Sequence, residues 1–290
     1  MTKVAALVRA LRPGHWVKNV FVLAALVFAQ KLGDLQAVLT GLGGFAVFCL
    51  LSSAVYLIND IADREEDRLH PIKRERPVAS GLVPVWAAGV VALALATLAL
   101  GGAMGLGLAF TGVACSYLLL NLAYSVALKR VVILDVMLVA AGFLLRAWAG
   151  AVLLDVAMSH WLVLCTGLIA LFLGFVKRRQ EMVGAQEAHT ARPILREYSL
   201  PFLDQMIAVV TSSTVLAYAL YAFSSEVAEK LDTPYLGFTI PFVLFGIFRY
   251  LYLVHQRGEG DNPTELVLSD RPFVVNVLLW ASAVVLALYV

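Results

Sequence analysis

Nine long apolar stretches, separated by polar or turn-forming residues, dominate the pattern of hydrophobic and polar positions along the chain. A helix that crosses the hydrocarbon core of a bilayer needs about 20 mostly apolar residues. Stretches of about that length cover residues 17–33, 37–59, 84–102, 104–126, 131–154, 160–176, 202–223, 236–254 and 272–290. The pattern therefore predicts an all-α, polytopic membrane protein, a bundle of nine transmembrane helices in which the first span is the weakest.

Composition agrees with this class of protein. Of the 290 residues, 61% are hydrophobic and 14% are charged, whereas soluble proteins carry about 25% charged residues. Basic residues interrupt the first apolar stretch and no small-residue cleavage site follows it, so no signal peptide is expected. Because the polar connections are too short to fold alone, we expect residues 1–290 to form one transmembrane helical domain.

The distribution of Lys and Arg predicts the orientation of this bundle. With the N-terminus in the cytoplasm, the loops at about 60–83, 127–130, 177–201 and 255–271 are cytoplasmic. That side then holds 18 of the 22 Lys and Arg residues, Arg192 and Arg257 among them. Cytoplasmic loops are enriched in Lys and Arg, so we expect a multi-pass protein of the plasma membrane whose active site opens to the cytoplasm.

An acidic cluster, residues 59–67, follows the second apolar stretch directly. If the helix continues at about 100° per residue, Asp60, Asp63 and Asp67 fall within an arc of about 60°. Glu65 and Glu66 then point elsewhere. Grouped carboxylates favour a hard cation such as Mg2+, which is often shared with phosphates. A solvated loop rich in charges is the alternative interpretation.

Three basic clusters lie at the same ends of the apolar stretches. They contain Lys73, Arg74 and Arg76 after the acidic cluster, Lys129 and Arg130 after the fourth stretch, and Lys177, Arg178 and Arg179 after the sixth. Phosphate oxygens accept charge-assisted hydrogen bonds from Lys and Arg, so the clusters indicate phosphate contacts. The alternative is that they only mark the cytoplasmic side. Glu181 lies one turn after Lys177 and could pair with it or bind a second metal ion.

The fifth stretch carries charged residues inside its apolar run. Asp135, Gly142 and Arg146 share one helix face, and a charged group within a bilayer costs on the order of 3 kcal/mol and rarely faces lipid. We therefore expect this face to line a polar cavity. Asp135 and Arg146 are about 16 Å apart along the helix axis and cannot neutralise each other. An ion pair between Arg146 and another helix is the open alternative.

These motifs resemble a known family. The pattern Asn59-Asp60-x-x-Asp63-x-x-x-Asp67, the nine stretches and the basic residues 73–77 are similar to the UbiA superfamily of intramembrane prenyltransferases over nearly the whole chain. Within it the sequence most resembles the decaprenyl-phosphate phosphoribosyltransferases, through residues 12–19, 124–129, 174–181 and 270–272. Two features differ from most members of the superfamily. A basic cluster replaces the second aspartate-rich motif, and the Tyr-to-Lys spacing, from Tyr124 to Lys129, is one residue longer.

The resemblance implies a reaction, a cofactor and a set of site residues. The reaction is transfer of the 5-phosphoribosyl group from phosphoribosyl diphosphate to a polyprenyl monophosphate of the decaprenyl type, with release of diphosphate, in the synthesis of arabinan precursors of the cell wall. Mg2+ would be held by Asp60, Asp63 and Asp67 with Asn59. The expected substrate-binding residues are Lys18, Asn19, Asn59, Lys73, Arg74, Arg76, Tyr124, Lys129, Asp135, Arg146, Lys177, Arg178, Arg179 and Glu181. No nucleic-acid partner is expected, and self-association into a homo-oligomer is left open.

Two other functions stay open on the sequence. An aromatic prenyltransferase would move a prenyl group from its diphosphate to a hydroxylated ring, and it would need a second carboxylate site, which only Glu181 and Asp135 could supply. A transporter would use Asp135 and Arg146 along a translocation path. Against a transporter, the charges gather at one membrane face, and paired helix breaks are not apparent.

Overall fold

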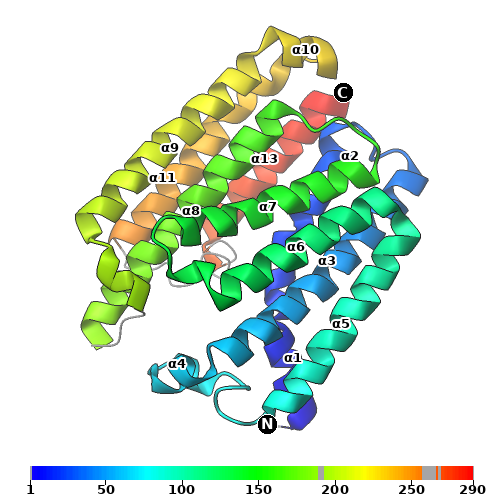
Figure 1. Cartoon of the computed structure of the whole chain (residues 1–290). Helices are drawn as coiled ribbons and strands as arrows, with labels where there is room; N and C mark the ends of the chain where they lie inside the picture. The colour runs from blue at the N-terminus through cyan, green and yellow to red at the C-terminus, as the bar shows by residue number, and fades with distance from the viewer. Residues whose placement is uncertain (1, 189–192, 257–265, 267–268, 290) are drawn as a thin grey trace. The chain divides into compact units, whose positions relative to one another are not determined.

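The structure is a computed structural model and describes residues 2–188, 193–256, 266 and 269–289; Arg192 and Arg257 lie outside them. Throughout these ranges the chain forms helices and no strand. Eight of the helical segments are long and apolar enough to cross a membrane. They contain α3 (Leu35–Ala62), α5 (Val85–Leu106), α6 (Leu108–Val126), α7 (Leu134–Leu153), α8 (His160–Ala188), α9 (Leu200–Phe223), α11 (Ile240–Gln256) and α13 (Arg271–Tyr289), as Figure 1 shows. The protein is therefore an all-helical, multi-pass membrane protein.

The predicted first span, residues 17–33, is not one continuous helix. A short helix, α1 (Lys3–Leu11), ends at Arg12, whose backbone is left-handed with φ 53°. The 3-10 segment η1 (Pro13–Leu23) and the short helix α2 (Ala24–Phe28) follow. Runs of 3-10 helix longer than three or four residues are uncommon, and hydropathy does not report backbone geometry. The described residues thus do not confirm a count of nine long helices.

Side chains and glycine set the helix boundaries locally. Asp34 caps α3, since its Oδ1 accepts hydrogen bonds from the backbone N–H groups of Gln36 and Ala37 at 2.9 and 3.2 Å. Such an N-cap satisfies donors that the first helical turn leaves unpaired. Gly107 separates α5 from α6 with φ 131°, a backbone conformation that glycine adopts without steric penalty. One long apolar region is thereby divided into two spans.

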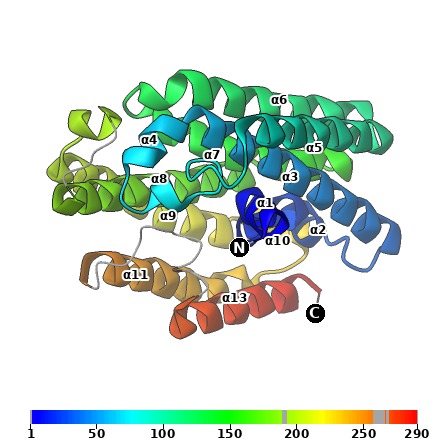
Figure 2. The same cartoon turned by 90° about the horizontal axis from the view of Figure 1, so that it is seen from below.

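Backbone contacts divide the chain into two compact units. Unit 1 contains residues Met1–Met158 and Gln186–Glu197, and unit 2 contains residues Ser159–Ala185 and Tyr198–Val290. In unit 2, α11 and α13 lie side by side, and α9 contacts α11 (Figures 1 and 2). That residues 1–290 act as one domain stays a prediction.

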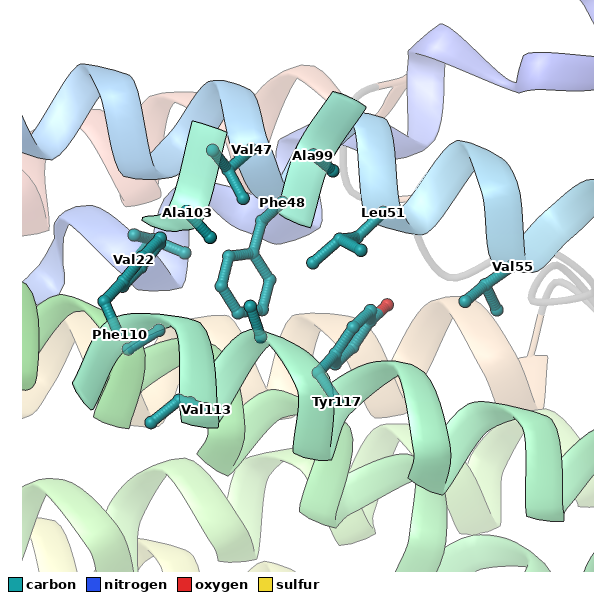
Figure 3. Packing of buried hydrophobic residues seen from close by; sticks show 12 residues of the cluster. Val22, Val47, Phe48, Leu51, Val55, Ala99, Ala103, Phe110, Val113 and Tyr117 are labelled. Carbon is teal, nitrogen blue, oxygen red and sulfur yellow. The ribbon is translucent and has the colours of Figure 1, made fainter. Parts of the chain in front are cut away.

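The long helix α3 is the centre of unit 1. It contacts α1, η1, α5, α6 and α7. In Figure 3 the buried Phe48 of α3 points toward α6, where its ring centroid lies 6.0 Å from that of Phe110 and 5.2 Å from that of Tyr117. Ala99 and Ala103 of α5 are fully buried against the same cluster. Small residues of this kind let helix backbones approach closely in a membrane, and the packing fixes the helix that carries the acidic motif.

Candidate functional site

The acidic motif lies where α3 ends. Helix α3 stops at Ala62, and the short helix α4 (Arg64–Leu69) begins after Asp63. The side chains of Asp60, Asp63 and Asp67 are buried, with exposed fractions of 1%, 3% and 2%. Glu65 and Glu66 are exposed. The three aspartates thus turn inward as their spacing predicts, although the helix is interrupted at Asp63, and the solvated-loop interpretation does not hold for them.

Two arginines from different segments bind the outer members of this trio. Nη2 of Arg12, which follows α1, lies 2.5 Å from Oδ1 of Asp60. Nη1 of Arg76 lies 3.3 Å from the same oxygen and 2.7 Å from Oδ2 of Asp67. Arg76 therefore bridges two carboxylates that are seven residues apart in the sequence.

The middle aspartate has a separate set of partners. Asp63 forms an ion pair with Lys129, which lies in the 3-10 segment η3 (Leu128–Arg130), and accepts a hydrogen bond from Nδ2 of Asn59 at 3.0 Å. Oγ of Ser125 donates in turn to Oδ1 of Asn59 at 3.3 Å. We call these two groups of ion pairs together the ion-pair cluster; it consists of Asp60, Asp63, Asp67, Arg12, Arg76 and Lys129, whose formal charges cancel.

The chemistry of this cluster fits a divalent cation. As they stand, the described residues contain no group of three His, Cys, Asp or Glu side chains arranged to hold a metal ion. However, Oδ2 of Asp60 is buried and has no hydrogen-bond partner. An unpaired buried oxygen of a charged group is costly, and a hard cation prefers oxygen ligands. Asp60 therefore offers a free ligand, beside two further carboxylates that cationic side chains occupy.

A second polar group lies around Arg146 of α7. Its guanidinium donates hydrogen bonds to Oδ1 of Asn19 at 2.8 Å, to the backbone oxygen of Gly142 at 2.8 Å and to the hydroxyl of Tyr117 at 2.6 Å. Asn19 is fully buried and donates to Oγ of Ser52 at 3.2 Å. Among the described residues Arg146 forms no ion pair, so the alternative of a carboxylate partner on another helix is wrong there. The side chain is 6% exposed.

Lys18 precedes Asn19 on η1 and lies near the same group. It is partly buried, and in the part of the chain that the structure describes its ammonium group has no hydrogen bond or ion pair. The positive charges of Arg146 and Arg12 act on it. Asp135, at the far end of the helix face that carries Arg146, is completely buried. Lys18 and Arg146 are thus two cations close to Asn19 that have no carboxylate partner among the described residues.

Three further predicted residues of unit 1 are Lys73, Arg74 and Tyr124. Lys73 and Arg74 belong to the 3-10 segment η2 (Lys73–Glu75), where Lys73 is partly buried and Arg74 is exposed. Tyr124 is partly buried near the end of α6. Their contact with a substrate stays a prediction.

The third basic cluster lies on α8 and belongs to unit 2. Arg178 forms an ion pair with Glu181, and Nζ of Lys177 lies 4.0 Å from Oε1 of the same glutamate. Of the two roles that the sequence left open for Glu181, the structure shows the pairing with Lys177. Nε of Arg179 lies 2.5 Å from Oδ1 of Asp204. These cations have carboxylate partners within their own unit, and their role in phosphate binding stays a prediction.

Sequence reasoning did not assign Arg12, Tyr117 or Ser125 to the site. Arg12 lies 48 residues before Asp60, and no spacing rule connects two such positions. Tyr117 and Ser125 lie within an apolar stretch, where their types are common. Residues 12–19 and 124–129, which contain Arg12 and Ser125, supported the family resemblance but did not indicate which carboxylates these side chains would contact.

The helices and the buried oxygen ligands define a multi-pass membrane protein with a polar interior site. The chain belongs to the UbiA prenyltransferase family, whose model matches residues 19–268. It is 36% identical over 302 residues to the decaprenyl-phosphate phosphoribosyltransferase of Mycolicibacterium smegmatis, covering 99% of this chain and 93% of that protein. It is 35% identical over 293 residues to the protein of the same name from Corynebacterium glutamicum, covering 98% of this chain and 87% of that protein.

The fold is also similar to that of a solved structure. A UbiA homolog from Archaeoglobus fulgidus, bound to GPP and Mg2+, superposes with a TM-score of 0.73. The match covers 98% of this chain and 100% of that chain, at 19% sequence identity. At this identity the likeness supports the helical fold and not the substrate.

Proposed function

We propose that this protein transfers the 5-phosphoribosyl group of phosphoribosyl diphosphate to a polyprenyl monophosphate of the decaprenyl type and releases diphosphate. The two relatives with that transferase name are similar over nearly the whole chain. The structural observation that supports the proposal most is the pair of charge environments within unit 1. A buried carboxylate cluster lies in the same unit as two cations without carboxylate partners, Lys18 and Arg146. A metal-bound diphosphate and a separate phosphate require such a pair.

The acidic residues provide the cation site in this proposal. Asp60, Asp63 and Asp67, with the amide oxygen of Asn59, would hold Mg2+, which when bound neutralises negative charge on a diphosphate. Arg12, Arg76 and Lys129 form ion pairs with these carboxylates. They are therefore placed to donate charge-assisted hydrogen bonds to diphosphate oxygens when the site is filled. These donors stabilise the charge that develops on the leaving group.

The bond changes need no general base. An oxygen of the lipid phosphate forms a bond to the anomeric carbon of the ribose, and the bond from that carbon to the diphosphate oxygen breaks, with its electron pair leaving on the diphosphate. A phosphate monoester has a second pKa near 6 and is already an anion at neutral pH. The chain therefore has to orient two anions and to exclude water, which would otherwise attack the same carbon.

The orientation of the protein in the membrane follows from the distribution of its positive charges and from the solubility of the donor. We place the N-terminus and the ion-pair cluster on the cytoplasmic side of the plasma membrane, because the positive-inside rule favours that orientation and phosphoribosyl diphosphate is soluble in water. The isoprenoid tail lies among apolar helices. The product would be a lipid-linked phosphoribose that serves as a precursor of cell-wall arabinan.

The reaction itself can be tested with purified protein in detergent. Labelled phosphoribosyl diphosphate, decaprenyl phosphate and Mg2+ are expected to give label in the lipid fraction and one diphosphate per labelled lipid, with no ion gradient present. No transfer of label, together with consumption of a prenyl diphosphate and an aromatic acceptor, would show an aromatic prenyltransferase instead. Activity that appears only in sealed vesicles with a gradient would favour a transporter.

Metal binding is expected to depend on diphosphate. The ion-pair cluster is neutral, so a divalent ion alone adds two positive charges to a buried site, whereas a diphosphate compensates them. Inorganic pyrophosphate should therefore tighten Mn2+ binding by about 10-fold or more, and Mn2+ should tighten pyrophosphate binding by the same factor. Titration calorimetry of each ligand, with and without the other, measures both. Equal Mn2+ affinity in both conditions would contradict the arrangement.

A further inference from the structure

The charge of Arg146 is held by neutral acceptors. An amide oxygen, a backbone carbonyl and a hydroxyl take its hydrogen bonds, and its guanidinium carbon lies 4.7 Å from the centroid of the Tyr117 ring. A buried ion without a counter-ion is strongly unfavourable. Asp135, on the same helix face, is about 16 Å away along the axis and does not compensate it. Unit 1 therefore maintains a fixed positive charge in its interior.

Lys18 adds a second cation to the same region. Arg146 donates a hydrogen bond to Asn19, the residue after Lys18, and the positive charges of Arg146 and Arg12 both act on Lys18. Arg12 is already paired with Asp60. Like charges brought together in a partly buried site repel each other more strongly than in water. The ammonium group of Lys18 donates no hydrogen bond to any of the described residues. In the absence of a ligand, the electrostatic contacts that act on its ammonium group are therefore unfavourable.

The formal charges specify the missing partner. Arg12 and Asp60 cancel, so Lys18 and Arg146 leave two positive charges. A phosphate monoester carries about −1.5 to −2 charges at neutral pH and accepts several hydrogen bonds. A bulkier anion such as a diphosphate has its own cations in the ion-pair cluster, namely Arg76 and Lys129.

We propose that Lys18 binds a phosphate monoester in a second anion site, separate from the ion-pair cluster, and that Arg146 is a positioning residue behind it. The positive charge of Arg146 attracts the anion, and its guanidinium donates a hydrogen bond to Asn19, which neighbours Lys18 on η1. This inference rests on the proposed function and assigns the residue that separates the two phosphate sites of the reaction. The monoester is either the phosphate of the lipid acceptor or the 5-phosphate of the ribosyl donor. The experiment below distinguishes the two.

The first measurement is the thermal stability of the ligand-free, full-length protein in detergent. Lys18→Gln removes a repelled charge and breaks no hydrogen bond, so the melting temperature is expected to rise by about 2–4 °C. Lys3→Gln, an exposed lysine on α1 of the same unit, is the matched control and should leave it unchanged. A lysine that only supports the fold would give a lower melting temperature instead, and a decrease would overturn the proposal.

The second measurement is binding of three probes to the parent and to both variants. The probes are ribose 5-phosphate, geranyl phosphate as a short polyprenyl phosphate, and inorganic pyrophosphate with Mg2+. Lys18→Gln is expected to lower the affinity for a monoester by about 10-fold or more and to leave the affinity for pyrophosphate unchanged. Lys18→Arg, which keeps the charge, should retain part of the affinity for the monoester. Weaker binding of geranyl phosphate assigns the site to the acceptor, and weaker binding of ribose 5-phosphate assigns it to the donor. Unchanged affinity for both monoesters, or equal loss of all three probes, would overturn the proposal.

Failure of the proposed function would look different. If the parent protein binds a monoester through Lys18 but transfers no phosphoribosyl group, the proposed reaction is wrong and the proposed anion site stands. If the parent protein transfers the group and Lys18→Gln keeps the parent KM values for both substrates, the reaction stands and the anion site is wrong.

Discussion

Asp60→Asn is expected to lower the rate of phosphoribosyl transfer by at least about 100-fold while the protein stays folded. The carboxylate of Asp60 pairs with Arg12 and Arg76, and its second oxygen is buried without a partner. Asparagine has the same size but no charge, so it can neither anchor a divalent ion as strongly nor keep the two arginines in place. The rate is measured in detergent with saturating substrates, and folding is followed by thermal melting.

Glu66→Gln provides the control for this substitution. Glu66 lies in the same acidic run but is exposed, so neutralising it should change the rate by less than about twofold and leave melting unchanged. If Asp60→Asn retains the activity of the parent, the cation site lies elsewhere and the acidic motif has only a structural role. If both substitutions abolish the rate, the loss reflects the total charge near the membrane surface and not a particular ligand.

Gly150→Ala is expected to have the largest effect on structure. A Cβ atom on Gly150 of α7 would overlap the backbone carbonyl oxygen of Val22 in η1. A backbone group cannot rotate away as a side chain can, so η1 has to move, together with Lys18 and Asn19. Overpacking of this kind costs about 1–3 kcal/mol, and we expect a lower melting temperature together with loss of activity.

Gly101→Ala is the matched comparison. Gly101 lies in α5, and nothing lies within 4 Å of the position that its Cβ would occupy. The substitution should be neutral or slightly stabilising, since alanine has a higher helix propensity than glycine. Were Gly150→Ala to melt at the parent temperature with full activity, the close approach of η1 to α7 would not be needed for the site.

The sequence predicted those parts of the molecule that depend on local periodicity. Hydropathy located eight long helices, and a spacing of three and four residues placed Asp60, Asp63 and Asp67 inward. The i,i+4 spacing offered Lys177 as one possible partner of Glu181, and the structure shows that pair. Each of these interactions is governed by residues within one or two helical turns.

Other parts depend on contacts that no local pattern encodes. The ion pair between Arg12 and Asp60 joins positions 48 residues apart. η1 packs closely on α7 at Gly150, whereas the apolar stretch of residues 17–33 predicted one continuous span, although the weakest of the nine. Arg146 has neutral partners because Asn19 and Tyr117 come from other elements of the bundle. Only the folded chain shows which of two plausible partners such a charge has.

The length of α3 bears on how the two substrates meet. Its 28 residues rise about 42 Å at 1.5 Å per residue, whereas the hydrocarbon layer is about 30 Å thick. With its first turn at one boundary of that layer, the helix extends about 12 Å past the other, so that Asp60 reaches the depth of the lipid headgroups. The highly charged sugar donor then does not have to enter the hydrocarbon layer, and the phosphate of the lipid acceptor lies at the depth of the other lipid headgroups. The isoprenoid tail lies in the hydrocarbon layer, away from the bond between phosphate and ribose. Any preference of the enzyme for one tail length therefore depends on residues far from that bond.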